Sequence, residues 1–162
     1  MGRAYEWTGD DHAALVAYTL AVELDPLQSR FYTSLAELYL IHRLPAQAEA
    51  VLREGVRLVP SGDTNVYWVH RMHVLLAWIA SGKGDRAAQL SALGNAEKYM
   101  GERYPALAFS LGSAYATMSP PAKEPAIRLL MRFYKIGCRG AAAAKFTEEC
   151  EQTASLLEWL EQ

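Results

Sequence analysis

The chain has 162 residues, of which 51% are apolar and 21% charged, and its formal net charge is −2 at pH 7. This composition excludes an intrinsically disordered chain, and the small net charge gives no overall attraction to nucleic acid or to a membrane surface. Alanine (26) and leucine (21) far outnumber valine plus isoleucine (12). Because alanine and leucine lose little side-chain freedom in a helix, the composition predicts an all-α protein.

Amphipathic segments of about a dozen residues alternate with short turns along the whole chain. Asp10 or Asp11 is placed to cap one helix through its carboxylate, and Asp25-Pro26 ends that helix, because the residue before a proline is pushed out of the α region. Pro45 suits the first turn of a helix, and Thr64 is a candidate cap. The other predicted helices cover residues 1–7, 29–42, 46–58, 64–80, 86–99, 105–118, 125–136 and 141–160.

The sequence repeats itself with a period of 34 residues. Four pairs of identical or similar residues lie 34 positions apart: Pro26 and Pro60, Tyr5 and Tyr39, Gly2 and Ala36, and Ala14 and Ala48. The segment Leu111–Tyr115 repeats Leu35–Tyr39 at a distance of 76 positions, which is two periods of 38. A repeat of this length predicts stacked antiparallel helix pairs, with extra residues inserted in the third pair.

These residues resemble the tetratricopeptide repeat, in which small residues let two helices approach closely, large ones fill the gaps and a proline ends the second helix. The segment 29–60 carries the pattern most fully, through Tyr32, Leu35, Ala36, Tyr39, Ala48, Leu52, Gly55 and Pro60. The first repeat matches through Gly2, Tyr5, Ala14, Tyr18, Ala21 and Pro26, and the fourth through Leu111, Gly112 and Tyr115.

The resemblance implies an all-α solenoid of helical hairpins that curves into a right-handed superhelix. About four helix pairs would fill residues 1–136, and a capping segment and helix would fill residues 137–162. The first pair is short at its start, which favours a chain that is a fragment of a longer protein.

In this family the first helix of each pair lines a concave groove that receives an extended peptide or a partner helix. The resemblance therefore implies a scaffold or adaptor that binds another protein. The groove-facing positions of the family correspond here to Arg30, Thr33, Glu37, Leu40 and Ile41, and in the fourth pair to Phe109, Ser113 and Ala116. The lysine and asparagine set with which chaperone co-factors of the family hold a C-terminal carboxylate is absent, which disfavours a partner of that type.

Three other roles fit the same repeats. A secretion chaperone would hold an unfolded client in the groove. A homo-oligomerising scaffold would use the outer helices or the last helix. An accessory domain would belong to a longer catalytic chain.

No motif in the sequence predicts catalysis, a cofactor or a metal site. Gly-x-Ser-x-Gly, a phosphate-binding glycine loop, His-Glu-x-x-His and Cys-x-x-Cys are all absent. His70 and His73 have the spacing of two metal ligands on one helix, but no cysteine or carboxylate lies near them, so we interpret them as an exposed polar edge. His12 and His42 lie beside turns and are expected to be solvated. We therefore expect a protein that is not an enzyme and that needs no cofactor.

Charge is concentrated in the last two predicted helices. Basic residues recur at helical spacing as Arg128, Arg132, Lys135 and Arg139, and the next helix carries Glu148, Glu149, Glu151, Glu158 and Glu161. As antiparallel neighbours, the two helices would bring these charges together at the rim, each pair contributing under about 1 kcal/mol. No nucleic-acid-binding motif accompanies the basic stripe, so we expect no nucleic-acid partner. The longest apolar run, Val74–Ala80, is too short for membrane insertion.

The last predicted helix has two interpretations. Its apolar residues can bury against the fourth pair while its glutamates face water, which would cap the solenoid. Alternatively, the helix packs against a partner helix or a second copy of the chain. The apolar residues concerned are Phe146, Leu156, Leu157, Trp159 and Leu160.

The two cysteines, Cys138 and Cys150, also leave two outcomes open. If Ala141–Leu160 is one unbroken helix, Cys150 lies about 13 Å along it, too far for a disulfide, whose Cα atoms are usually under about 7 Å apart. If the helix restarts near Thr147, which can cap it, residues 141–146 fold back and the bridge closes. A bridge would indicate an oxidising compartment such as a periplasm, and two free thiols would indicate the cytoplasm.

Overall fold

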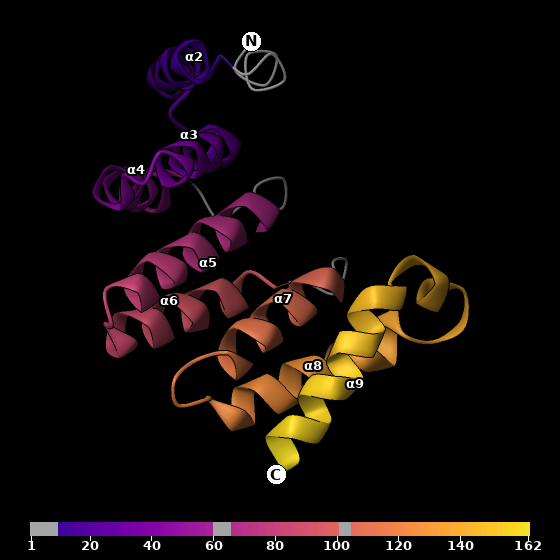
Figure 1. The fold of residues 1–162 in the computed structure, drawn as a ribbon. Helices are drawn as coiled ribbons and strands as arrows, with labels where there is room; N and C mark the ends of the chain where they lie inside the picture. Colours follow the sequence, from indigo (N-terminus) through magenta and orange to yellow (C-terminus); the bar gives the residue numbers. More distant parts are fainter. Residues whose placement is uncertain (1–9, 60–65, 101–104) are drawn as a thin grey trace. The chain divides into compact units, whose positions relative to one another are not determined.

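The computed structural model describes residues 10–59, 66–100 and 105–162. Over these residues the protein is all-α, with eight α-helices, one 3-10 helix and no strand (Figure 1). The predicted all-α class is confirmed. The predicted helix at residues 1–7 and the cap at Thr64 lie outside the described residues.

The elements are α2 (Asp11–Leu24), α3 (Ser29–Ile41), α4 (Pro45–Leu58), α5 (Val66–Gly82), α6 (Arg86–Lys98), α7 (Pro105–Ala116), α8 (Lys123–Gly137), η1 (Gly140–Lys145) and α9 (Thr147–Glu161).

Local signals in the sequence account for several helix ends. The Asp10 carboxylate accepts a hydrogen bond from the Ala13 backbone N–H at 3.0 Å, and Asp85 caps α6 in the same way through Ala88 at 2.9 Å. These bonds satisfy donors that a helix start otherwise leaves unpaired. Pro45 is the first residue of α4, as predicted. After α5 the chain turns through Gly84, whose φ of 70° lies in the left-handed region that glycine adopts without strain.

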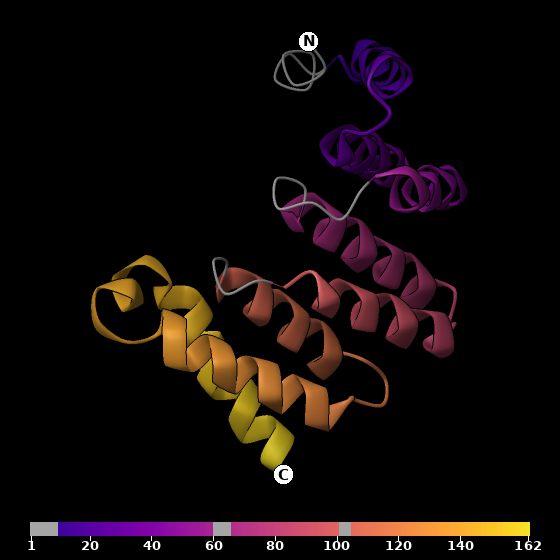
Figure 2. The same ribbon diagram turned by 180° about the vertical axis from the view of Figure 1, so that it is seen from behind.

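The chain divides into two compact units, Met1–Tyr99 and Met100–Gln162. In the first unit, α5 and α6 lie side by side in both views (Figure 2), and α3 packs against α4. The contact between α3, α4 and α5 depends on a small residue, because a Cβ atom added at Gly55 would lie 2.6 Å from Tyr32 Cγ and 2.8 Å from Met72 Sδ. Tyr32 is itself buried, and its hydroxyl donates to the Pro26 carbonyl at 3.1 Å.

In the second unit, α7 and α8 pack closely and α9 contacts both. A Cβ atom at Gly112 would lie 2.8 Å from Leu130 Cγ, so only glycine allows this approach. The inner side of α9 buries Thr153 and Leu160. The expectation that Trp159 is buried is wrong: the side chain is 48% exposed, because it lies on the outer side of α9.

The predicted helix at 141–160 is also wrong in its first turn and a half. Residues Gly140–Lys145 form η1 instead, and α9 begins at Thr147. Gly140, the first residue of η1, has a φ of 59°, in the left-handed region that glycine adopts without strain. Thr147 does not cap α9: Phe146 occupies the cap position without a side-chain hydrogen bond, and the Thr147 hydroxyl donates to the Ala143 carbonyl at 3.4 Å.

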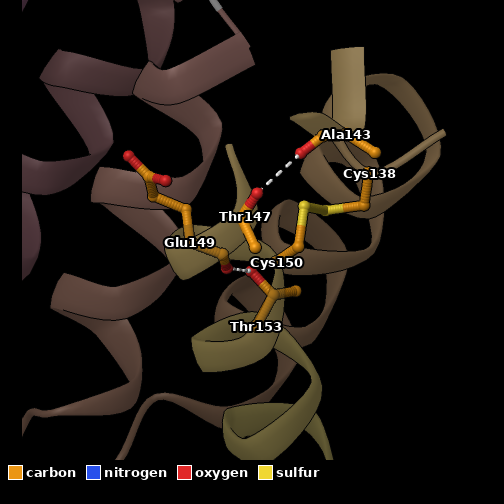
Figure 3. The surroundings of a disulfide bond; sticks show 6 residues. All are labelled: Cys138, Ala143, Thr147, Glu149, Cys150 and Thr153. Carbon is orange, nitrogen blue, oxygen red and sulfur yellow. Dashed lines mark hydrogen bonds between the residues drawn. A yellow bond between two sulfur atoms is a disulfide. The ribbon is translucent and has the colours of Figure 1, made fainter. Parts of the chain in front are cut away.

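This restart brings the two cysteines together. Cys138 and Cys150 form a disulfide with their Cα atoms 5.6 Å apart (Figure 3). Of the two outcomes that the sequence left open, the structure therefore has the bridge, which ties the end of α8 to the first turn of α9.

The packing of α4 makes a prediction about two nearby alanines. Ala48 is fully buried and Ala50 is exposed. Ala48→Leu is expected to lower the free energy of unfolding by about 1–3 kcal/mol, because the larger side chain overpacks the contact. Ala50→Leu adds the same atoms to solvent-facing surface and is expected to stay within about 0.5 kcal/mol of wild type. Urea unfolding of the two variants measures the difference, and equal midpoints would contradict the packing of α4.

Candidate protein-binding groove

A groove of about 390 Å³ lies between α3 and α5 in the first unit. Its two most prominent apolar side chains are Ile41, which is 69% exposed, and Trp78, which is 61% exposed. Large apolar side chains that stay in water beside a groove mark a surface suited to contact with another molecule. We call this feature the α3–α5 groove; it is lined by Leu40, Ile41, Arg71, Val74, Leu75 and Trp78.

Two polar contacts join the helices that form the groove. Arg71 on α5 donates from Nε and Nη2 to Oε1 of Glu37 on α3, each at 2.9 Å. Both side chains are partly exposed, so the ion pair contributes under about 1 kcal/mol of stability. The Arg30 guanidinium of α3 lies 5.8 Å from the ring centre of Trp68 on α5. A partly exposed cation–π contact of this kind adds about 0.5–1 kcal/mol.

The structure brings most of the predicted α3 residues to this face of the first unit. Leu40 and Ile41 line the groove, and Glu37 accepts a hydrogen bond from Arg71, which lines the α5 side of the groove. Arg30 lies at the start of α3, in the contact with Trp68. Thr33 is a correction: it is fully buried, and its hydroxyl donates to the Ser29 carbonyl at 3.0 Å, so it offers nothing to a partner.

The predicted residues of the fourth pair lie on α7 in the second unit. Ala116 is a second correction, because it is completely buried and cannot line a groove. Phe109 is half-buried and packs on Phe133, with ring centres 5.3 Å apart. The hydroxyl oxygen of Ser113 is buried without a hydrogen-bond partner among the described residues. These positions therefore resemble packing residues more than a binding face.

Sequence reasoning missed the α5 side of the groove. The 34-residue period contained the signal, since Arg71 lies 34 positions after Glu37, and Val74 and Leu75 lie 34 after Leu40 and Ile41. Projecting the α3 positions by one period would have found all three.

A second groove, of about 340 Å³, lies between α4, α5 and α6 and is more polar. Most of its charged side chains already form ion pairs. Glu49 pairs with Arg53 at 2.8 Å and with Lys83, and these hydrogen bonds lower the pKa of the Glu49 carboxyl. Arg57 pairs with Glu54 at 2.6 Å. Since a ligand would have to break these pairs, the α3–α5 groove is the better candidate site.

The interpretation of His70 and His73 as an exposed polar edge is wrong. Both are buried, because α6 packs over the side of α5 that carries them. His70 Nδ1 donates to the Ala96 carbonyl at 3.1 Å, and His73 stacks on Tyr99 with ring centres 5.6 Å apart. Burial lowers the pKa of both rings, that of His73 to about 4, and the charge of His70 also lowers the pKa of His73.

The remaining histidines are exposed, as predicted. His12 lies on the outer side of α2, and His42 Nε2 lies 3.3 Å from Asp11 Oδ2. In the part of the chain that the structure describes, no three histidine, cysteine or acidic side chains gather where they could hold a metal ion.

A scan against protein-family models and a search of curated proteins each find no match to this chain. None of the described helices combines the length and apolar character needed to cross a bilayer.

Proposed function

We propose that this chain is a tetratricopeptide-like interaction module that binds a peptide or a helical segment of another protein in the α3–α5 groove. The observation that carries the proposal is the pair of exposed side chains, Ile41 and Trp78, beside a groove between two helices. Tryptophan and arginine are enriched among residues that dominate binding energy, and the groove contains Trp78 and Arg71.

Two contacts at the repeat distance support the tetratricopeptide-like arrangement. Arg71 pairs with Glu37, and Lys83 pairs with Glu49, and both pairs are 34 residues apart. Equivalent positions of successive repeats would meet in this way if consecutive helix pairs stack in register. The close approach at Gly55 fits the use of small residues between helices in that family.

The lining of the groove favours a particular kind of ligand. Apolar side chains supply most of it, and the one arginine is already paired with Glu37. The groove therefore suits recognition of apolar side chains presented at helical or extended spacing rather than a clamp on a terminal carboxylate.

A library of phage-displayed random peptides, selected on the immobilised full chain, would test the proposal. Selected peptides are synthesised with a fluorophore and titrated by anisotropy. Ile41→Asp combined with Trp78→Ala is expected to weaken binding by at least about tenfold, or about 1.4 kcal/mol, because it removes both apolar anchors. Both side chains are mostly in solvent, so helicity and the unfolding midpoint should stay near wild type.

Leu24→Asp is the matched control, because Leu24 is an exposed apolar residue on α2 outside the groove. It is expected to leave the affinity of the same peptides unchanged. Peptides that bind the double variant as tightly as wild type would contradict the groove as the binding site.

A further inference from the structure

The outer side of α8 is basic and apolar. Its inner side buries Ala126, Leu129, Leu130, Phe133 and Gly137. The opposite side forms a shallow hollow of about 410 Å³, lined by Arg128, Met131, Arg132, Lys135 and Ile136. Met131 and Ile136 are 40% and 44% exposed. We call this surface the α8 outer face.

The outer side of α9 has the opposite charge. Its inner side buries Thr153 and Leu160, and its outer side carries one large exposed aromatic side chain, Trp159. The exposed acidic residues of α9 are Glu148, Glu151, Glu158 and Glu161. We call this surface the α9 outer face.

Part of the charge on the two faces is not paired between α8 and α9, as the sequence suggested it would be. Arg132 and Lys135 form no ion pair with any residue that the structure describes, and neither do Glu151 and Glu158. The predicted rim pairing is therefore wrong for these residues. The reason is that each helix turns its apolar side toward the core of the second unit and its charged side to water. The Cys138–Cys150 bridge joins the two helices in this arrangement.

Charge on each face gathers on one side of its helix. Arg132 and Lys135 are three residues apart on α8, and Glu151 and Glu158 are seven residues apart on α9, so each pair lies on one side of its helix. Met131 lies next to Arg132, and Trp159 lies next to Glu158, so apolar surface accompanies charge on both faces.

We propose that a second copy of this chain is the partner of the α8 outer face, to which it brings its α9 outer face. Charge complementarity selects this occupant, since the chain itself supplies an acidic helix with an exposed tryptophan. Each copy carries both faces, so association either closes into a dimer or continues into longer chains. This surface belongs to the second unit and does not depend on the groove in the first.

Sedimentation velocity of the oxidised full chain tests the proposal. Self-association is expected at about 20 mM salt, and the dissociation constant is expected to rise at least about tenfold at about 500 mM salt, because ions screen exposed charges. A protein that remains monomeric at low salt would overturn the proposal. A protein that stays monomeric but binds vesicles of anionic lipid would also overturn it, since the α8 outer face would then bind a membrane.

A charge swap makes the test specific for the two faces. Arg132→Glu with Lys135→Glu makes both faces acidic. Glu151→Lys with Glu158→Lys puts cations on both faces and removes the net negative charge of the α9 outer face, so each variant alone is expected to be monomeric. Their equimolar mixture is expected to associate again, because opposite charges then meet. Arg53→Glu with Lys98→Glu, on helices of the first unit, makes the same change of net charge as the first variant and is expected to leave association at the wild-type level.

Circular dichroism checks that each variant folds. If a charge reversal unfolds the second unit, the neutral pair Arg132→Gln and Lys135→Gln replaces it and is expected to weaken association at least about tenfold. Folded variants whose mixture stays monomeric, or whose separate masses match the wild-type assembly, would overturn the proposal.

Discussion

The first unit is expected to lose about 2–3 kcal/mol of stability as the pH falls from about 7.5 to about 4.5. The cause is the burial of two histidines, His70 and His73, on α5. Burial lowers the pKa of His73 from 6.5 to about 4 and lowers that of His70 in the same direction. Between pH 6.5 and about 4 the unfolded chain binds a proton at His73 while the folded chain does not, so protons favour unfolding, and the lowered pKa of His70 acts in the same direction. The loss is complete once the pH passes below the pKa values of the folded state.

Urea unfolding at several pH values measures this loss. In a Trp159→Phe background, every remaining tryptophan lies in the first unit, so fluorescence reports that unit alone. His73→Phe is expected to keep the stacking on Tyr99 and to flatten the pH dependence between about 6.5 and 4.5. His12→Phe, at an exposed position, should leave it unchanged. A wild-type stability that is constant over this range would show that the histidines are not buried as described.

Removing the disulfide is expected to destabilise the second unit by about 3 kcal/mol, through the added freedom of the unfolded chain. Cys138 and Cys150 close a loop with a sequence separation of 12. Cys138→Ser with Cys150→Ser should therefore lower the stability reported by Trp159 fluorescence, measured with the other tryptophans replaced. The stability of the first unit should not change, because the bridge lies wholly within residues 100–162.

Counting thiols checks the bridge itself. Protein purified without reductant and unfolded in guanidinium is expected to show no reactive thiol, and two after reduction. This result would favour an oxidising compartment over the cytoplasm. Two reactive thiols before reduction would contradict the bridge and remove the support for that compartment.

Features set by neighbouring residues could be predicted from the sequence. Asp10 begins α2 through its carboxylate, Pro45 begins α4, and Asp25, the residue before Pro26, directly follows the end of α2, as predicted. The exposure of Ile41 on α3 was also predictable, because the resemblance to the tetratricopeptide repeat places this position on the groove side of its helix. Local chemistry and periodicity carry this information without knowledge of the tertiary structure.

Features set by tertiary packing were not predictable in the same way. The helix α5 packs against α3 and α4 and also against α6, so it buries residues on more than one side. Polar residues such as His70 then become buried although their spacing suggests an exposed edge. Thr33 was misplaced for a related reason: its hydroxyl bonds to the Ser29 carbonyl, so the side chain can be buried without an unsatisfied polar group.

Chemical-shift mapping by NMR tests most directly whether the α3–α5 groove is a binding site. A groove-selected peptide is added to the isotope-labelled full chain, and the backbone amides and the Trp78 indole N–H are followed. The expected result is a cluster of saturable shifts on α3 and α5 around Glu37, Ile41, Arg71 and Trp78, with α8 and α9 unaffected. Shifts confined to other helices, with the Trp78 indole signal unmoved at saturation, would contradict the proposed function.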